Sequence, residues 1–200
     1  GALKGALKVA VPLSFGLMHL GSVINEFLQQ HPDIEFDLDF NDRQVDLLAE
    51  GFDLAIRIAS LADSSLIARR LAPIQTILCA SPDYLERNGI PHELEALRQH
   101  RCLAYNLTNP IEQWQVYDAG GQLIKISTRP YLKAGNGEFL RDAAVAGLGI
   151  VLIPTFIVYK EIERGTLVPL LTDYHCPPLS AYAIYPQTRH LSQRVRAFVD

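Results

Sequence analysis

The sequence alternates between short apolar strands and amphipathic helices, with proline or glycine at many of the boundaries. Residues 7–11 are predicted to form a strand that Pro12 ends, and residues 34–41 alternate between apolar and polar, mainly acidic, side chains, as a half-exposed strand does. A short helix at 45–50 and a third strand at 53–58 follow. The first strand is followed by an apolar stripe at helical spacing, made of Leu17, Leu20, Ile24, Phe27 and Leu28. Because strands separated by helices usually pair in parallel, we predict an α/β fold with helices covering the sheet.

The second half of the sequence repeats this order of elements. A predicted strand at 131–133 precedes the break Gly135-Asn136-Gly137, a helix at 138–146 and an apolar strand at 150–153. Two such units favour two lobes with a cleft, in which helix N-termini face one another. A hairpin at 114–127 interrupts the pattern, and the strand and helix near the C-terminus are expected to return to the first lobe.

Proline and glycine also predict boundaries between these two units. Pro73 is expected to separate a strand at 66–71 from a strand at 74–80. The next helix carries signals at both ends: Ser81 as its cap, Pro82 in its first turn and Gly89 at its end.

The composition excludes several classes of protein. The 200 residues are 48% hydrophobic and 20% charged, which is ordinary for a globular protein with a full core. No apolar run approaches the roughly 18 residues of a membrane span. With 18 basic against 22 acidic residues and a formal charge of −4, the chain lacks the basic excess typical of a nucleic-acid-binding domain. We therefore expect this chain by itself to bind neither DNA nor a membrane.

The cysteines and the first residues suggest a cytoplasmic protein of greater length. Three cysteines favour reduced, packed thiols over a disulfide or thiol chemistry: Cys79, Cys102 and Cys176. The sequence begins at Gly1 with neither an initiator methionine nor an export signal, so we expect it to be a piece of a longer polypeptide.

Catalytic and metal-binding signatures are not found in the sequence. It contains no nucleophile elbow, no Walker loop and no His-Glu-x-x-His helix. Gly147-Leu148-Gly149 follows a helix and enters a strand, the reverse of a dinucleotide loop, and is interpreted as a helix C-terminal cap. His92, His100 and Cys102 lack the paired spacing of a metal site and are interpreted as surface histidines and a core cysteine. We predict no catalytic residue, no metal and no cofactor.

Polar residues at element boundaries are better candidates for a ligand site. Ser14 lies where the first strand gives way to a helix, so its hydroxyl and the free backbone N–H groups could receive an anion, or Ser14 could simply cap the helix. Gly135-Asn136-Gly137 offers an amide side chain at a second helix N-terminus, or only a tight turn. Arg57 lies toward the C-terminal end of a strand, where open α/β sheets bind ligands, and could pair with a carboxylate ligand or with Asp53 or Asp63.

Four segments together resemble the effector-binding domain of LysR-type transcriptional regulators, and they cover nearly the whole chain in order. They are LKVAVPLSFG at 7–16, VDLLAEGFDLAIRI at 45–58, LCASPDYL at 78–85 and AAVAGLGIVLIP at 143–154. The resemblance implies a type 2 periplasmic-binding-protein-like fold of two Rossmann-like subdomains with a central cleft. Subdomain I is expected at 1–79 plus 181–200 and subdomain II at 80–180. It also implies an N-terminal winged helix-turn-helix domain that this chain does not contain.

The resemblance further implies a set of effector-binding residues, carried over position by position. The first lobe contributes Leu13, Ser14, Phe15, Asn41, Arg57 and Ile58, with Ser64 and Ser65 in a loop that often completes the pocket. The second lobe contributes Asn136, Gly137 and Phe156, the last of which could instead face the core. Effectors in this family are commonly small carboxylates or aromatic acids.

The resemblance implies a partner and a mechanism as well. Effector binding would change the angle between the lobes and so the spacing of the missing DNA-binding domains in a homodimer or tetramer. The first helix and the acidic strand at 34–41 resemble the surface through which family members pair, or only pack inward. Two alternatives share the architecture: a free solute receptor of a transporter, and an enzyme that uses Ser14, Arg57 and a nearby acid.

Overall fold

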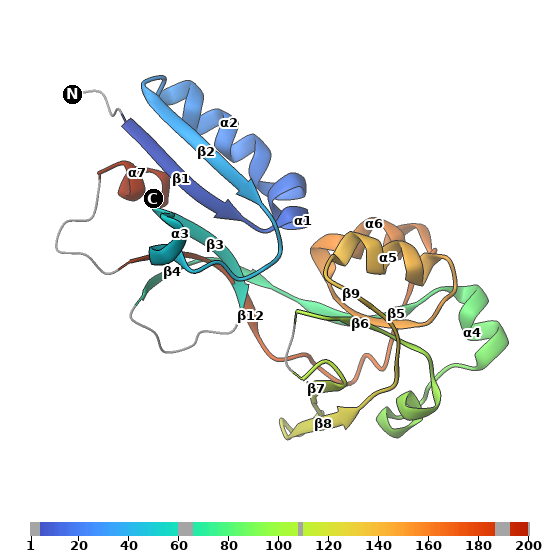
Figure 1. Ribbon diagram of the computed structural model, residues 1–200. Helices are drawn as coiled ribbons and strands as arrows, with labels where there is room; N and C mark the ends of the chain where they lie inside the picture. The colour runs from blue at the N-terminus through green and yellow to red at the C-terminus, as the bar shows by residue number, and fades with distance from the viewer. Residues whose placement is uncertain (1–4, 60–65, 108–109, 187–192, 200) are drawn as a thin grey trace. The chain divides into compact units, whose positions relative to one another are not determined.

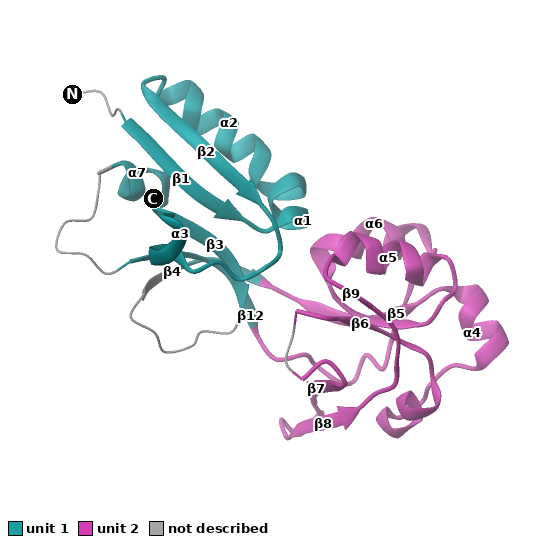
Figure 2. Ribbon diagram, viewed as in Figure 1, with its two compact units in different colours: residues 1–73, 179–200 teal, residues 74–178 magenta. Residues whose placement is uncertain are grey.

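The chain forms two compact units, coloured separately in Figure 2. The computed structural model describes residues 5–59, 66–107, 110–186 and 193–199. Unit 1 contains Gly1–Pro73 and Leu179–Asp200, and unit 2 contains Ile74–Pro178.

Unit 1 is built on a five-stranded sheet in the order β2-β1-β3-β12-β4. Strand β1 pairs in parallel with β2 and β3, whereas β12 is antiparallel to β3. The sheet is therefore mixed, and the expected parallel pairing holds only for its first three strands. The strands are β1 Gly5–Val11, β2 Ile34–Phe40, β3 Leu54–Ala59, β4 Leu66–Ile74 and β12 Leu179–Pro186.

The helices of unit 1 include one continuous run after β1, seen at the tip of that strand in Figure 1. Its consecutive parts are α1 Leu13–Phe15, the π-helical η1 Gly16–Leu20 and α2 Gly21–Gln30; the others are α3 Leu47–Glu50 and α7 Gln193–Val199. The predicted apolar stripe is wrong at Leu17, which is 62% exposed, and right at Ile24, which is buried. The wider π-turn, in which Gly21 N–H donates to the Gly16 carbonyl, changes the rotation per residue that the stripe assumed.

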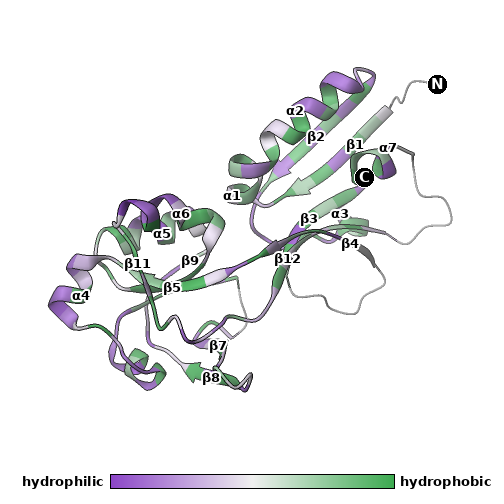
Figure 3. Cartoon of the chain, turned by 180° about the vertical axis from the view of Figure 1, so that it is seen from behind, coloured by the Kyte–Doolittle hydropathy of each residue, from purple (hydrophilic) through white to green (hydrophobic). Residues whose placement is uncertain are grey.

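Apolar contacts hold the helices of unit 1 on its sheet. Ala10, Val45, Leu47, Phe52 and Ala55 form a buried cluster beneath α3. Elsewhere in unit 1 the rings of Phe27 on α2, Phe36 on β2 and Phe198 on α7 contact one another. Figure 3 shows hydrophobic and hydrophilic residues alternating along α2, as expected for a helix with one face on a sheet.

Unit 2 has a second five-stranded sheet, in the order β11-β5-β10-β6-β9, and a separate two-stranded hairpin. Strand β6 is parallel to β10 and β9, and β5 is antiparallel to β10 and β11. Its strands are β5 Thr76–Ala80, β6 Cys102–Tyr105, β9 Pro130–Ala134, β10 Ile150–Pro154 and β11 Val168–Leu170, and the predicted hairpin is β7 Gln113–Tyr117 with β8 Leu123–Ser127. Its helices are α4 Pro82–Asn88, η2 Leu94–Gln99, α5 Gly137–Val145 and α6 Thr155–Arg164.

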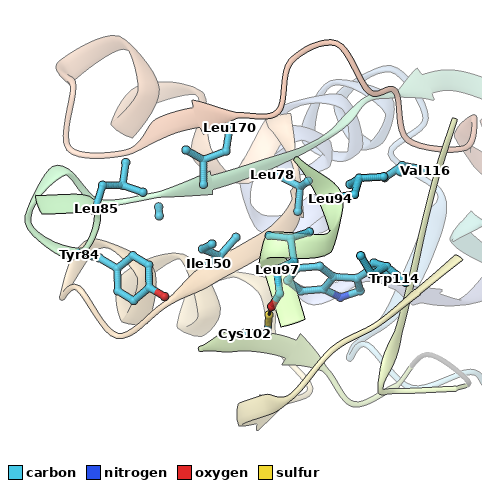
Figure 4. Close-up of a cluster of buried hydrophobic side chains, with 12 residues drawn as sticks. Leu78, Tyr84, Leu85, Leu94, Leu97, Cys102, Trp114, Val116, Ile150 and Leu170 are labelled. Carbon is cyan, nitrogen blue, oxygen red and sulfur yellow. Dashed lines mark hydrogen bonds between the residues drawn. The ribbon is translucent and has the colours of Figure 1, made fainter. Parts of the chain in front are cut away.

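Successive side chains of the unit 2 strands enter two different cores, because neighbouring strand residues point to opposite faces. Leu78 and Ile150 pack with α4, η2 and the hairpin in the cluster of Figure 4. Cys79 and Val151 pack with α5 and α6 on the other face. The sheet is thus covered on both faces, which explains its nearly continuous apolar strands.

The structure confirms most of the predicted boundaries and corrects one. Ser81 Oγ accepts a hydrogen bond from Tyr84 N–H at 3.1 Å and so caps α4. Gly147 adopts the left-handed conformation, with a φ of 84°, after α5, as expected of a helix C-terminal cap. The predicted break at Pro73 is wrong, since β4 runs through it to Ile74. An edge strand tolerates proline because one side of its backbone is not paired, and β4 is an edge strand.

The structure also shows the state of the cysteines and the length of the helices. All three cysteines are free, with Cys79 and Cys102 fully buried. Among the described residues, no helix is both long enough and apolar enough to cross a membrane.

Candidate functional site

The candidate residues of unit 1 gather where its parallel strands end. Because β1, β2 and β3 run in parallel, their carboxyl ends share one edge of the sheet. Leu13, Ser14 and Phe15 follow β1, Asn41 follows β2, and Arg57 and Ile58 lie near the end of β3. This edge is where open α/β sheets bind their ligands. Ser64 and Ser65, the remaining candidates of this half, lie outside the described residues.

A carboxylate of the protein itself occupies the first backbone donor of the helical run. Leu13 N–H donates to Asp42 Oδ1 at 3.0 Å. The interpretation of Ser14 as the helix cap is wrong, because the N-cap residue is Pro12 and Ser14 is the second residue of α1, where it is buried. The helix N-terminus attracts negative charge, and Asp42 supplies part of it from the end of β2.

Arg57 donates to a backbone carbonyl, and Asp53, one of the two acidic partners considered from the sequence, has a different partner. Its Nη2 donates to the Val45 carbonyl at 2.5 Å. Asp53 instead accepts a hydrogen bond from Lys8 N–H through Oδ2 at 2.8 Å, and Asp63 lies outside the described residues. Burial lowers the pKa of Arg57, and the nearby charge of Asp46 partly opposes this shift. The cation is thus partly desolvated, and its hydrogen bond within the described ranges goes to a carbonyl.

Two buried polar atoms at this edge lack a hydrogen-bond partner within the described part of the chain. They are Asn41 Oδ1, an acceptor, and Arg57 Nε, a donor. Extending the strand registers by one or two residues places Asn41 and Arg57 on either side of β1, both at the level of Pro12. Leaving such a group unpaired costs about 1–3 kcal/mol. A ligand that completes these bonds would recover that free energy.

The candidate residues of unit 2 also gather at the carboxyl ends of parallel strands. Asn136 and Gly137 follow β9, and Phe156 follows β10 at the start of α6. Asn136 caps α5, since its Oδ1 accepts a hydrogen bond from Phe139 N–H at 2.9 Å. A Cβ on Gly137 would lie 2.5 Å from Ile157 Cδ1, so this glycine allows α5 and α6 to approach closely. The structure therefore brings Asn136, Gly137 and the N-terminus of α6 together.

Sequence reasoning missed three polar residues at these two edges. Asp42 was overlooked although it directly follows Asn41 at a strand end, which is the signal that could have found it. Asn106 follows β6 and approaches Gly135, whose Cβ would lie 3.2 Å from Asn106 Oδ1. Thr76 opens β5 opposite Pro154, and its buried Oγ1 has no partner among the described atoms. A partnerless hydroxyl has no sequence signature.

Two of the residues weighed as metal ligands, His100 and Cys102, have other surroundings. His100 Nδ1 lies 2.6 Å from the Tyr84 hydroxyl, which also accepts a hydrogen bond from Arg101 N–H. Cys102 is buried, and burial raises the pKa of its thiol to about 12. Within the described ranges, no group of three or more His, Cys, Asp or Glu residues is arranged to hold a metal ion.

Comparison with known proteins identifies the family. Residues 1–200 match the model of the LysR substrate binding domain. The chain belongs to the LysR family. An uncharacterized HTH-type transcriptional regulator of Haemophilus influenzae is 36% identical to this LysR-family chain over 195 residues, which cover 97% of the chain and 67% of the relative. The chain spans about two thirds of the length of the curated relatives that it matches.

Solved structures of LysR-type regulators share this fold. Full-length AphB, a virulence activator of Vibrio cholerae, is 31% identical with a TM-score of 0.84, and the match covers all of this chain and 68% of AphB. The regulatory domain of CrgA from Neisseria meningitidis is 32% identical with a TM-score of 0.82, covering 99% of this chain and 97% of that domain. The predicted type 2 periplasmic-binding-protein-like fold is thereby confirmed. The chain is the effector-binding domain of a LysR-type transcriptional regulator, and its named relatives are transcriptional regulators.

Proposed function

We propose that this domain binds a small carboxylate or aromatic acid, and that binding alters how the full-length regulator engages DNA. The observation that carries the proposal is that the candidate residues of each unit lie at the carboxyl ends of parallel strands. We take the two units as subdomains I and II, each of which carries candidate residues at such an edge. The effector is then a ligand of the cytoplasmic regulator and not a substrate.

Groups that can bind a carboxylate are present in both units. In unit 1, Arg57 Nε–H is a buried cationic donor that lacks an acceptor within the described ranges. In unit 2, the first turn of α5 begins at Gly137, and the N-terminus of a nine-residue helix favours an anion. Aromatic or aliphatic parts of the effector would contact Phe15, the last residue of α1, and Phe156 in the first turn of α6.

Control of DNA binding would require the rest of the polypeptide and a second copy of it. We propose that DNA is bound by an N-terminal winged helix-turn-helix domain in a homodimer or tetramer. The helical run after β1 offers exposed apolar side chains for pairing, with Leu17 62% and Val23 51% exposed. Strand β2 adds two exposed acidic residues, Glu35 and Asp37.

The mechanism we propose is a population shift between relative arrangements of the two units, driven by tighter effector binding to one of them. Solution scattering and a DNA footprint of the full-length regulator, each with and without effector, test it. Both profiles should change on binding. Tight effector binding that leaves both profiles unchanged would contradict the mechanism.

The site itself is tested by the double variant Ser14→Ala/Asn136→Ala. We expect it to weaken the effector's binding by tenfold or more, while the melting temperature falls by only a few degrees. Ser81→Ala is the matched control, because it removes the N-cap of α4 as Asn136→Ala removes that of α5. The control should lose similar stability and keep full affinity. Unchanged affinity in the double variant would remove both residues from the site.

A further inference from the structure

The two buried polar atoms without a hydrogen-bond partner at the carboxyl edge of unit 1 are one acceptor and one donor. Asn41 Oδ1 lacks a hydrogen-bond donor and Arg57 Nε–H lacks an acceptor. When the strand registers are extended, the two residues lie on either side of β1, at the same height along the strands. Because side chains alternate between the faces of a sheet, both belong to the face that carries Ala10 and Ala55. One small molecule with an acceptor group and a donor group could therefore meet both needs.

A simple carboxylate can form a hydrogen bond with only one of these two atoms. Its oxygens accept from Arg57 Nε–H, but they bring no hydrogen to Asn41 Oδ1. A hydroxyl or ammonium group beside the carboxylate supplies that hydrogen. The pairing of an unfilled acceptor with an unfilled donor thus favours a carboxylate that also carries a donor.

The surrounding charges disfavour a second carboxylate on the ligand. Asp42 already places a carboxylate oxygen 3.0 Å from Leu13 N, and Asp46 is near enough to act on the charge of Arg57. A second negative charge at this edge would be repelled by both side chains. The ligand is therefore best described as a monocarboxylate.

The segment between β2 and α3 is held in contact with Arg57. Val45 in this segment is buried, and its carbonyl accepts from Arg57 Nη2. Arg43 in the same segment is tied to Glu50 by two hydrogen bonds to the carboxylate. Because Asn41 Oδ1 and Arg57 Nε are themselves buried, a ligand that reaches both atoms must be small.

We propose that the effector is a small monocarboxylate carrying a hydrogen-bond donor, such as a 2-hydroxy or 2-amino acid, with its carboxylate on Arg57 and its donor on Asn41. This proposal rests on the proposed function above and adds the chemical class of the effector. Asn41 is then the residue that determines specificity, and Arg57 binds the charge common to all carboxylates.

Calorimetric titration of the 200-residue chain with matched acids tests the proposal. The pairs are lactate and propionate, alanine and propionate, and mandelate and phenylacetate, whose members differ in the donor. In at least one pair, the acid with the donor should bind about tenfold more tightly. Asn41→Leu should reduce this preference to less than twofold without lowering the melting temperature, because it removes an unsatisfied polar atom. Arg57→Met should weaken both members of the pair alike.

The outcomes separate this proposal from the proposed function. Equal binding of both members of every pair, weakened by Arg57→Met, would overturn the donor requirement and leave carboxylate binding in place. A preference that survives in Asn41→Leu would overturn the role of Asn41. Binding of none of these acids would overturn both the donor requirement and the assignment of the effector as a small carboxylate.

Discussion

Leu13 N–H donates a hydrogen bond to Asp42 Oδ1 at 3.0 Å, although the two residues are 29 positions apart. This bond ties the start of the helical run after β1 to the end of β2. It also places a carboxylate of the protein at a position where the sequence suggested an anionic ligand. Any effector at this edge must accommodate that carboxylate.

Removal of the Asp42 carboxylate should destabilise unit 1. We expect Asp42→Ala to lower the free energy of unfolding by about 1 kcal/mol, because Leu13 N–H loses its acceptor. Asp42→Asn keeps an acceptor oxygen and should lose less. Urea denaturation monitored by circular dichroism measures both. Wild-type stability in Asp42→Ala would show that the bond contributes nothing.

A methyl group at Gly137 should be costly, and shortening its neighbour should relieve the cost. Gly137→Ala is expected to lower stability by about 1–3 kcal/mol, because the added Cβ would lie 2.5 Å from Ile157 Cδ1. Ile157→Val removes that terminal carbon and should itself cost about 1 kcal/mol. In a double-mutant cycle, the combined loss should be smaller than the sum of the single losses. Strict additivity would contradict the predicted clash.

His100 should make the stability of unit 2 depend on pH. Burial lowers the pKa of His100, and its Nδ1 lies 2.6 Å from the Tyr84 hydroxyl. In the unfolded chain this histidine should titrate near pH 6.5, so below that pH the unfolded state binds more protons and stability falls. Stability should therefore rise with pH toward neutrality and then level off with respect to this group. His100→Gln should flatten that rise in denaturation curves between pH 5 and pH 8, and an unchanged slope would exclude His100 as its cause.

The three thiols should react slowly in the folded chain. Burial raises the pKa of Cys79 and Cys102 to about 12 and that of Cys176 to about 11, so little thiolate forms near pH 8. Labelling with a thiol reagent should follow unfolding, with Cys176 modified first because it is only partly buried. Rapid labelling of Cys79 or Cys102 in the native protein would contradict the buried environment.

The sequence was informative where local chemistry determines the structure. The caps at Ser81 and Gly147 and the hairpin between β7 and β8 could be predicted because turn and cap residues act on their own backbone. The pattern failed at Leu17, where a π-turn changes the helical phase, and at Pro73, which an edge strand accepts. Both failures depend on tertiary context.

In the candidate site, too, features set by neighbouring residues could be predicted, whereas contacts between distant residues could not. The positions of Ser14, Asn136 and Phe156 at helix starts follow from neighbouring proline and glycine residues. The bond from Leu13 N–H to Asp42 Oδ1 and that from Arg57 Nη2 to the Val45 carbonyl join separate elements. No spacing rule predicts such bonds, so neither the role of Asp42 nor the true partner of Arg57 could be obtained from the sequence.

Effector binding at the carboxyl edges is tested most directly by an NMR titration of the isotopically labelled chain with the matched acids, following backbone amide resonances. We expect saturable shifts with at least one acid, concentrated at Ser14, Phe15, Asn41 and Gly137, while amides near Ser81 and His100 stay unchanged. Shifts confined to the region of Ser81 and His100, or no saturable shift with any of the acids, would contradict it.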